Sequence, residues 1–135
     1  MSTAKVNQLV LNSQAGNFEL PRPEDNWILK ADQGYSPVQM VAAATTACGG
    51  YVYQEILTNS RVQFEMQKAE VSYTRDEVEN PAHPIKTIEI TFYLRVPAED
   101  QKKATSCLRL IGRHCPVMQS LDPQIQVTEK VIFVD

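Results

Sequence analysis

The sequence predicts a single α+β domain over residues 1–135, a length that can bury a hydrophobic core. Apolar and polar residues alternate over 88–96, which indicates a long strand with one buried face. Apolar residues spaced by three and four after Ser36 indicate a long helix. The predicted order is strands, helix, two strands, helices and a final strand. This order favours an α+β domain over a doubly wound sheet.

The first third of the chain is predicted to form three short strands, at 5–11, 16–20 and 27–31. The second and third are separated by residues 21–26, where two prolines, an aspartate and an asparagine favour a turn.

The long helix has favourable residues at its start. Ser36 can serve as the N-cap, Pro37 suits the first helical position, and Gln39 completes a capping box. Its predicted buried stripe consists of Val41, Thr45, Cys48, Val52 and Ile56. This stripe puts Cys48 on the inward face. The pair Gly49-Gly50 weakens the helix, and it allows either close approach of another segment or room for a ligand beside the thiol.

Two long strands are expected next. The run 64–75 alternates but changes phase near Lys68-Ala69, which predicts a β-bulge. Residues 76–86 are polar and contain two prolines, so they are expected to form an exposed loop before the strand at 88–96.

The last third is predicted to be mostly helical. A helix follows Pro97, and a second, short helix begins at Pro116. A final strand spans 125–134. The buried stripe of the first of these helices is predicted to be Ala104, Cys107, Leu108 and Ile111.

Composition limits the partners. The net charge is −3, and the sequence contains no basic cluster, so nucleic-acid binding is not expected. The longest apolar stretch, 38–47, is too short to span a bilayer, so no membrane segment is expected. The first residues lack the apolar core of a secretion signal, which predicts a cytoplasmic protein.

Three cysteines in such a protein argue against a structural disulfide framework. Metal binding is not expected either, because zinc sites use Cys and His in close pairs and this chain has only His83 and the adjacent His114-Cys115. Cys107 is assigned to the core.

The other two cysteines each have two readings. Cys115 directly precedes Pro116, so it is expected to cap the short helix. The helix terminus, with Arg113 and His114, would stabilise a thiolate, but a purely structural cysteine at the helix break is equally compatible. Cys48 lies in mid-helix, where a small core residue and a nucleophile are both compatible with the pattern.

Two segments together resemble the OsmC/Ohr family of peroxide-reducing proteins. One is the helix opening Ser36-Pro37 followed by the Ala-rich run to Cys48, and the other is Cys115-Pro116-Val117 through Leu121. The resemblance covers essentially the whole chain. It implies an OsmC-like α+β fold, with antiparallel sheets around long central helices in an intertwined homodimer.

The resemblance also implies a mechanism. Cys48 matches the family's peroxidatic cysteine, which attacks a peroxide as thiolate and becomes a sulfenic acid. Cys115 matches the resolving cysteine, which condenses with it into a disulfide. A dithiol or thiol reductant then restores both thiols. No cofactor and no metal are required.

Two catalytic features of the organic hydroperoxide branch are not matched here, so the broader OsmC-like group is the better match. That branch has a glutamate where this chain has Val38, and Gln39 is a neutral capping residue. It also uses an arginine from an N-terminal loop, whereas Arg22 lies in a proline-flanked turn without the surrounding motif. Glu55 does not match the family's catalytic acid. The alternative is a non-catalytic OsmC-like protein that binds a small apolar or thiol-bearing ligand.

Overall fold

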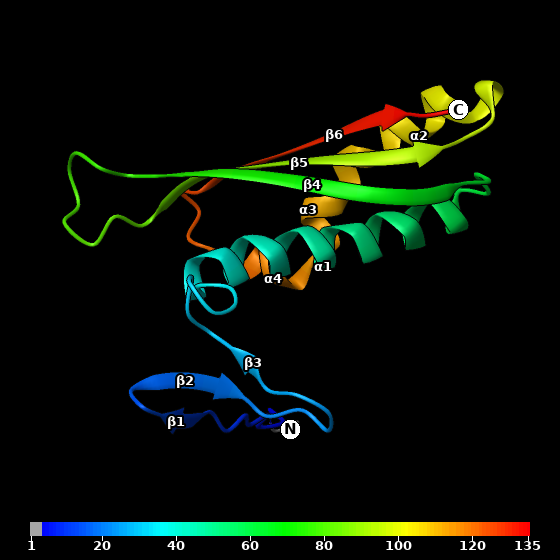
Figure 1. Ribbon diagram of the computed structural model, residues 1–135. Coiled ribbons are helices and arrows are strands. Elements are labelled where there is room, and N and C mark those ends of the chain that lie inside the picture. The colour runs from blue at the N-terminus through cyan, green and yellow to red at the C-terminus, as the bar shows by residue number, and fades with distance from the viewer. Residues whose placement is uncertain (1–3) are drawn as a thin grey trace. The chain divides into compact units, whose positions relative to one another are not determined.

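A three-stranded sheet is the framework on which the thiol-bearing helices are packed. In this computed structural model it consists of β4 (Glu65–Arg75), β5 (Ile85–Arg95) and β6 (Gln126–Phe133), shown in Figure 1. β4 pairs antiparallel with β5, whereas β6 pairs parallel with β5. The expectation of antiparallel sheets did not include this parallel pairing. It arises because the helices between β5 and β6 return the chain to the same end of the sheet.

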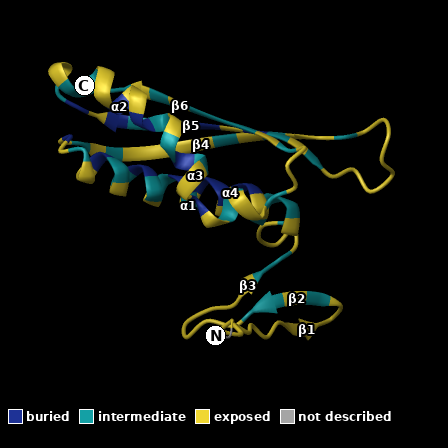
Figure 2. Cartoon of the chain, turned by 180° about the vertical axis from the view of Figure 1, so that it is seen from behind, coloured by how far each residue is buried: buried dark blue, intermediate teal, exposed yellow. Residues whose placement is uncertain are grey.

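The middle strand β5 has one fully buried face. Its side chains at 88, 90, 92 and 94 are 0% exposed, while Glu89 and Arg95 on the opposite face are exposed. Figure 2 shows the buried segments along β5 and on α1. The predicted alternation is therefore confirmed. The buried side chains of β5 belong to one hydrophobic cluster with residues of the helices, so the helices cover this face of the sheet.

Helix α1 (Pro37–Asn59) lies along this buried face (Figure 1). The predicted capping box is confirmed: the Gln39 backbone N–H donates to Ser36 Oγ at 3.1 Å, and the Ser36 N–H donates to Gln39 Oε1 at 2.8 Å. The predicted buried stripe is partly wrong, since Thr45 is buried but Val41 is 38% exposed and Cys48 only half-buried. Cys48, Val52 and Ile56 are partly buried and pack against the core. The fully buried residues of α1 are Ala42, Thr45, Thr46, Gly49, Tyr53 and Leu57.

The stripe is displaced because residue size decides which face of α1 packs most closely. Ala42 and Gly49 let the helix approach its neighbours, and Tyr53 fills the core beside Phe92 with ring centroids 5.2 Å apart. The Tyr53 hydroxyl donates to the Ala104 carbonyl at 2.7 Å, so its polar end is satisfied inside the core.

The segment after Pro97 is less regular than predicted. A short 3₁₀ turn precedes α2 (Gln101–Cys107), a second 3₁₀ turn follows it, and then come α3 (Ile111–His114) and α4 (Pro116–Ser120). The predicted single helix is thus broken into short pieces. Ala104, Cys107 and Ile111 are buried as predicted.

The bulge in β4 is confirmed by a register shift between Met66 and Lys68. The extra residue changes which side chains of β4 face the helices. Consequently Met66 and Ala69 both lie opposite buried residues of β5, Leu94 and Phe92 respectively.

The structure describes residues 4–135 and divides them into two units, one ending at Met40 and the other running from Val41 to Asp135. The first unit contains a small antiparallel sheet of β1 (Asn12–Gln14), β2 (Asn17–Leu20) and β3 (Trp27–Ile28).

The strand predicted at 5–11 is wrong, and the first strand of this sheet begins at Asn12. Ala15 and Gly16 both have positive φ, at 52° and 82°, which is the backbone of a tight two-residue hairpin turn. This turn sets the pairing of β1 with β2, whereas the residues before Asn12 have no neighbouring strand among those described.

Glu129 is an acidic residue on the helix-covered face of the sheet, opposite the buried Ile90. Burial raises its pKa, and its own backbone N–H offsets this only in part. An acid with a raised folded-state pKa favours the folded state at low pH, and this advantage is lost as pH rises through that pKa.

We therefore expect Glu129→Gln to gain stability relative to the wild type as pH is raised from 4 to 7. Urea denaturation at a series of pH values measures this difference. Glu89→Gln, on the exposed face of β5, is the matched control and should follow the wild-type profile. A constant offset between Glu129→Gln and the wild type at all pH values would contradict the expectation.

Candidate thiol site

Cys115 is the N-cap of α4, as predicted. Its backbone is extended, with φ −92° and ψ 110°, and Pro116 occupies the first helical turn. The Met118 backbone N–H donates to Cys115 Sγ at 3.5 Å. The sulfur therefore takes the place that a serine or aspartate oxygen often has at a helix start.

Burial outweighs this favourable cap. Cys115 is 0% exposed, and desolvation is the largest cause of its raised pKa; Cys48 raises it further, while the backbone N–H groups of Met118 and Val117 lower it only in part. Arg113 and His114 are exposed and are not among the groups that shift the pKa of Cys115. Of the two interpretations of Cys115, the raised pKa favours a protonated thiol at the helix break, because sequence spacing identified the cap but not its burial.

Cys48 lies at the edge of the same hydrophobic cluster. It is half-buried and packs against the core that includes Cys115. Cys48 is among the groups that raise the pKa of Cys115, and both residues belong to the same hydrophobic cluster, so the two side chains lie near each other. Both are free thiols. The fold thus brings together two cysteines that are far apart in sequence, the more accessible one on α1 and the fully buried one on α4.

Gly49, next to Cys48, explains how α1 and α4 approach so closely. A Cβ atom at this position would lie 2.7 Å from Met118 Cε and 3.6 Å from Ile111 Cγ2. Met118 is also the residue whose N–H binds Cys115 Sγ. Of the two readings of the glycine pair, close approach is the one found at Gly49. The role of Met118 was not predicted, because no sequence signal pairs it with residue 49.

The residues that could activate the Cys48 thiol make other contacts or are exposed to solvent. Gln39 is held in the capping box by Ser36, and Glu55 is exposed. Within its own unit, the Arg22 guanidinium lies 5.0 Å from the Trp27 ring centroid, and Nη1 lies 3.8 Å from Asp25. These contacts agree with the interpretation of Arg22 as a turn residue.

Cys107 is a core residue, as predicted. It is 5% exposed, and its Sγ lies 3.7 Å from Ser60 Oγ. Over residues 4–135, no three His, Cys, Asp or Glu side chains are grouped so that they could hold a metal ion. In the same part of the chain, no helix has the length and apolar character needed to cross a membrane.

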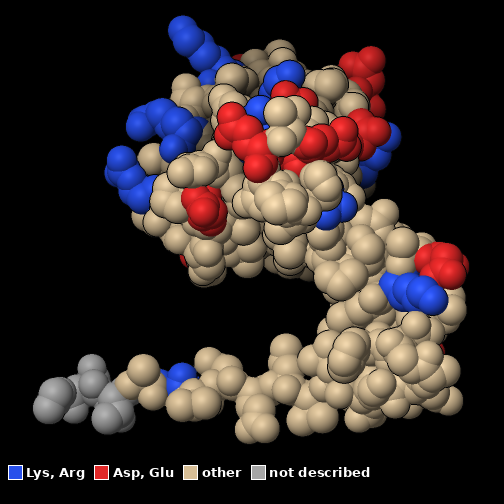
Figure 3. Space-filling model, turned by 90° about the vertical axis from the view of Figure 1, so that its left-hand side faces the viewer, with Lys and Arg blue, Asp and Glu red and all other residues tan. Residues whose placement is uncertain are grey.

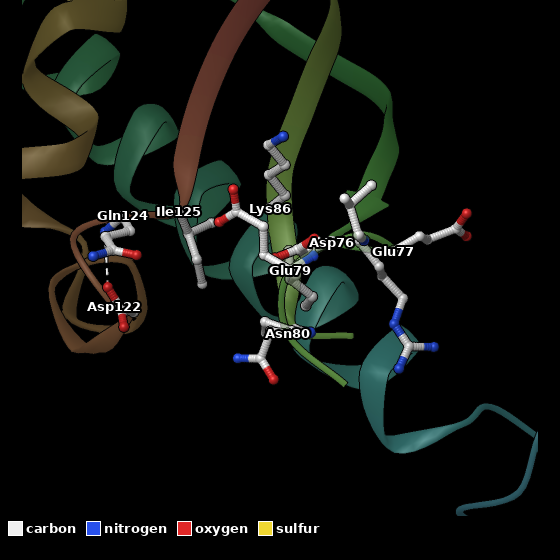
Figure 4. Close-up of a pocket in the computed structure, with 12 residues that line it drawn as sticks. Asp76, Glu77, Glu79, Asn80, Lys86, Asp122, Gln124 and Ile125 are labelled. Carbon is white, nitrogen blue, oxygen red and sulfur yellow. Dashed lines mark hydrogen bonds between the residues drawn. The ribbon is translucent and has the colours of Figure 1, made fainter. Parts of the chain in front are cut away.

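A cavity of about 740 Å³ lies at the end of the sheet, between the β4–β5 loop and the segment before β6 (Figure 4). Backbone N–H groups of Val78 and Glu79 bind the Asp76 carboxylate and lower its pKa. Figure 3 looks onto this end and shows acidic side chains in the middle of the face with basic ones to either side. None of the lining residues is a cysteine, so this cavity is not part of the thiol site.

A second hollow runs between α1 and the sheet, with a volume of about 400 Å³. We call it the α1 groove. Its surface is mainly apolar, and Cys48 is not part of its lining. The α1 groove is lined by Ala43, Thr46, Ala47, Gly50, Tyr51, Gln54, Met66, Ala69, Val71 and Phe92.

The fold and site therefore define an α+β protein with two adjacent free thiols under a helix-covered sheet. The family model described as OsmC-like protein matches residues 30–130. The chain belongs to the OsmC-like family, a group associated with peroxide and stress resistance. No curated protein matches the sequence.

Solved structures with the same fold are distant in sequence. An OsmC-like protein from Mycoplasma pneumoniae is 14% identical with a TM-score of 0.69, covering 96% of this chain and 99% of that one. The organic hydroperoxide resistance protein OhrB of Bacillus subtilis is 19% identical with a TM-score of 0.61, covering 93% and 96%. A Legionella pneumophila protein described as an organic hydroperoxide resistance protein and predicted redox protein is 13% identical, with a TM-score of 0.60 and coverage of 95% and 98%.

Proposed function

We propose that this protein reduces organic hydroperoxides or hydrogen peroxide with Cys48 as the nucleophile and Cys115 as the resolving thiol. The observation that supports this most is the pairing of a half-buried thiol with a fully buried one at the contact of α1 and α4. In this proposal the more accessible thiol meets the peroxide, and the buried thiol of the same cluster reacts with the product.

The proposed cycle balances without a cofactor. The Cys48 thiolate attacks the terminal peroxide oxygen, the O–O bond breaks, and the alcohol or water leaves with a proton, which yields a sulfenic acid. Cys115 then attacks the Cys48 sulfur, an S–S bond forms, and water leaves with the proton of the Cys115 thiol. A dithiol or two monothiols reduce the disulfide, and the proposed compartment is the cytoplasm, where such reductants are present.

The direct test is oxidation of the wild-type protein by one equivalent of cumene hydroperoxide. We expect the loss of two free thiols per chain, and peptide mass spectrometry should find one crosslink, between Cys48 and Cys115. Cys107 should remain a free thiol. Unchanged thiols after incubation, or a crosslink that includes Cys107, would contradict the proposal.

We further propose that the active form is a homodimer that covers the α1 groove and the outer face of α1. Tyr51 on this helix is 74% exposed and Val41 is 38% exposed, and both lie next to small residues that allow another helix to approach. Association would remove this apolar surface from water.

Sedimentation equilibrium tests the dimer. We expect the wild type to sediment as a dimer and Ala47→Arg to sediment as a monomer, because the new charge would lie in the buried contact. Ser72→Arg, which adds the same charge at an exposed site on β4, should remain dimeric. A monomeric wild type would contradict the proposal.

The α1 groove also supports a second candidate function, the binding of a small apolar or thiol-bearing ligand without catalysis. Its apolar lining from α1, β4 and β5 is the specific observation in favour. Native mass spectrometry of the purified protein would detect such a ligand. A bound metabolite together with thiols that do not react with hydroperoxide would favour binding over catalysis.

A further inference from the structure

Gly49 is a buried residue of α1 that leaves space for a side chain of α4. A Cβ atom at this position would lie 2.7 Å from Met118 Cε, 3.6 Å from Ile111 Cγ2 and 3.9 Å from Phe92 Cζ. The first distance is well below the contact distance of two carbon atoms, about 3.5–4.0 Å. The Met118 side chain can therefore lie against α1 only because residue 49 has no methyl group.

The backbone of Met118 is held to Cys115. The Met118 N–H donates to Cys115 Sγ at 3.5 Å, and the Gln119 N–H donates to the Cys115 carbonyl at 3.0 Å. The Gln119 side chain also donates to the Gly112 carbonyl at 2.8 Å, which ties α4 to α3. Because these bonds hold α4 and its cap together, a displacement of Met118 also displaces the Cys115 thiol.

The contact of Gly49 with Met118 lies beside the cysteine pair. Cys48 directly precedes Gly49 on α1, and Met118 is three residues after Cys115. Both cysteines pack in the same hydrophobic cluster. A disulfide needs its Cβ atoms about 3.5–4.5 Å apart, which is a narrow range. The packing of α4 on α1 at this point therefore affects whether the two sulfurs can meet.

We propose that Gly49 and Met118 are positioning residues for the resolving step, because their contact sets how closely Cys115 approaches Cys48. This inference rests on the proposed function and gives neither residue a part in the attack on peroxide. In the resolving step the S–S bond forms, the S–O bond of the sulfenic acid breaks, and the hydroxyl leaves with the Cys115 proton as water. The rate of such a step depends strongly on how closely the reacting atoms are held.

Gly49→Ala tests this contact, because the new methyl group would push Met118, and with it Cys115, away from α1. Alanine favours a helix more than glycine does, so α1 itself is not weakened. After one equivalent of cumene hydroperoxide, we expect disulfide formation to slow by about tenfold, while peroxide consumption stays within about twofold of the wild type. Dimedone traps the Cys48 sulfenic acid, and mass spectrometry of quenched samples follows the crosslink. A general loss of stability would not separate the two rates in this way.

A compensating variant and a matched control isolate the contact. Gly49→Ala/Met118→Leu keeps the methyl group but removes the Cε atom that it meets, and Leu and Met are similar in volume. Disulfide formation should return to within about threefold of the wild-type rate. Gly112→Ala adds the same methyl group on α3, where among residues 4–135 a Cβ atom would meet nothing within 4 Å beyond its own turn of helix. Both of its rates should equal those of the wild type. Disulfide formation at the wild-type rate in Gly49→Ala, or no recovery in the double variant, would overturn the inference.

A redox equilibrium tests the same contact without peroxide. Oxidised glutathione takes two electrons and two protons from the Cys48 and Cys115 thiols and leaves as two molecules of reduced glutathione. We expect the equilibrium constant for disulfide formation to fall by about tenfold in Gly49→Ala and to recover in the double variant. Equal constants in the wild type and Gly49→Ala would contradict the inference, as would a wild type that forms no disulfide with glutathione.

Met118→Phe keeps the test available if circular dichroism shows that Gly49→Ala does not fold. It enlarges the contact from the α4 side, so it should also lower the equilibrium constant, and an unchanged constant would overturn the inference.

These outcomes are distinct from a failure of the proposed function. If hydroperoxide does not oxidise wild-type Cys48, the proposed function fails, while the glutathione equilibrium still tests the contact. If hydroperoxide oxidises Cys48 and the disulfide forms equally fast in the wild type and Gly49→Ala, only the positioning role fails.

Discussion

Cys48→Ser is expected to lower the rate of hydroperoxide consumption by roughly 100-fold or more, close to the rate without protein. The physical reason is that the thiolate is the reactive form, and a serine hydroxyl remains protonated at neutral pH where a thiol is partly ionised. The loss of cumene hydroperoxide with excess dithiothreitol as reductant gives the rate.

Cys107→Ser is the matched control for this substitution. It changes the same atom in a cysteine that is 5% exposed and lies near Ser60 rather than in the thiol pair. We expect it to retain the wild-type rate. Peroxide consumption by Cys48→Ser at the wild-type rate would eliminate Cys48 as the nucleophile.

Phe92→Ala is expected to have the largest effect on stability, about 3–5 kcal/mol in the free energy of unfolding. Phe92 is 0% exposed on the middle strand, and its ring packs against Tyr53 and close to Gly50 of α1. Removing the ring leaves a cavity between the sheet and the helix that bears Cys48. Denaturation by urea measures the loss.

Phe18→Ala is the matched control for the core substitution. The chemical change is identical, but Phe18 is 57% exposed in the first unit. Because exposed side chains contribute little, we expect a change of about 0.5 kcal/mol or less. Similar losses for both variants would show that Phe92 is not part of a tightly packed core.

Local sequence patterns predicted the elements that depend on neighbouring residues. The capping box at Ser36 and Gln39, the cap at Cys115 and the alternation along β5 all formed as expected. The two caps depend on contacts between residues a few positions apart. The alternation along β5 reflects the period of two of a strand that has one buried face. The family assignment was likewise available from sequence, since both cysteine segments lie in short ordered motifs.

Properties that depend on tertiary packing were not predicted. The spacing of apolar residues predicts Val41 and Cys48 in the buried stripe, because it does not show that Ala42 and Gly49 pack closest to the core and leave Cys48 only partly buried. The raised pKa of Cys115 depends on burial by residues distant in sequence. The residues 5–11 are apolar enough for a strand, but strand formation needs a partner, and the tight turn at Ala15-Gly16 starts the pairing later.

The parallel pairing of β6 with β5 has a consequence for the order of folding. The hairpin of β4 and β5 closes a short loop, whereas β6 can join β5 only after the helical crossover between Arg95 and Gln126 has closed. Cys115 lies within that crossover. We therefore expect its approach to Cys48 to follow the formation of the β4–β5 hairpin, because the longer connection closes later.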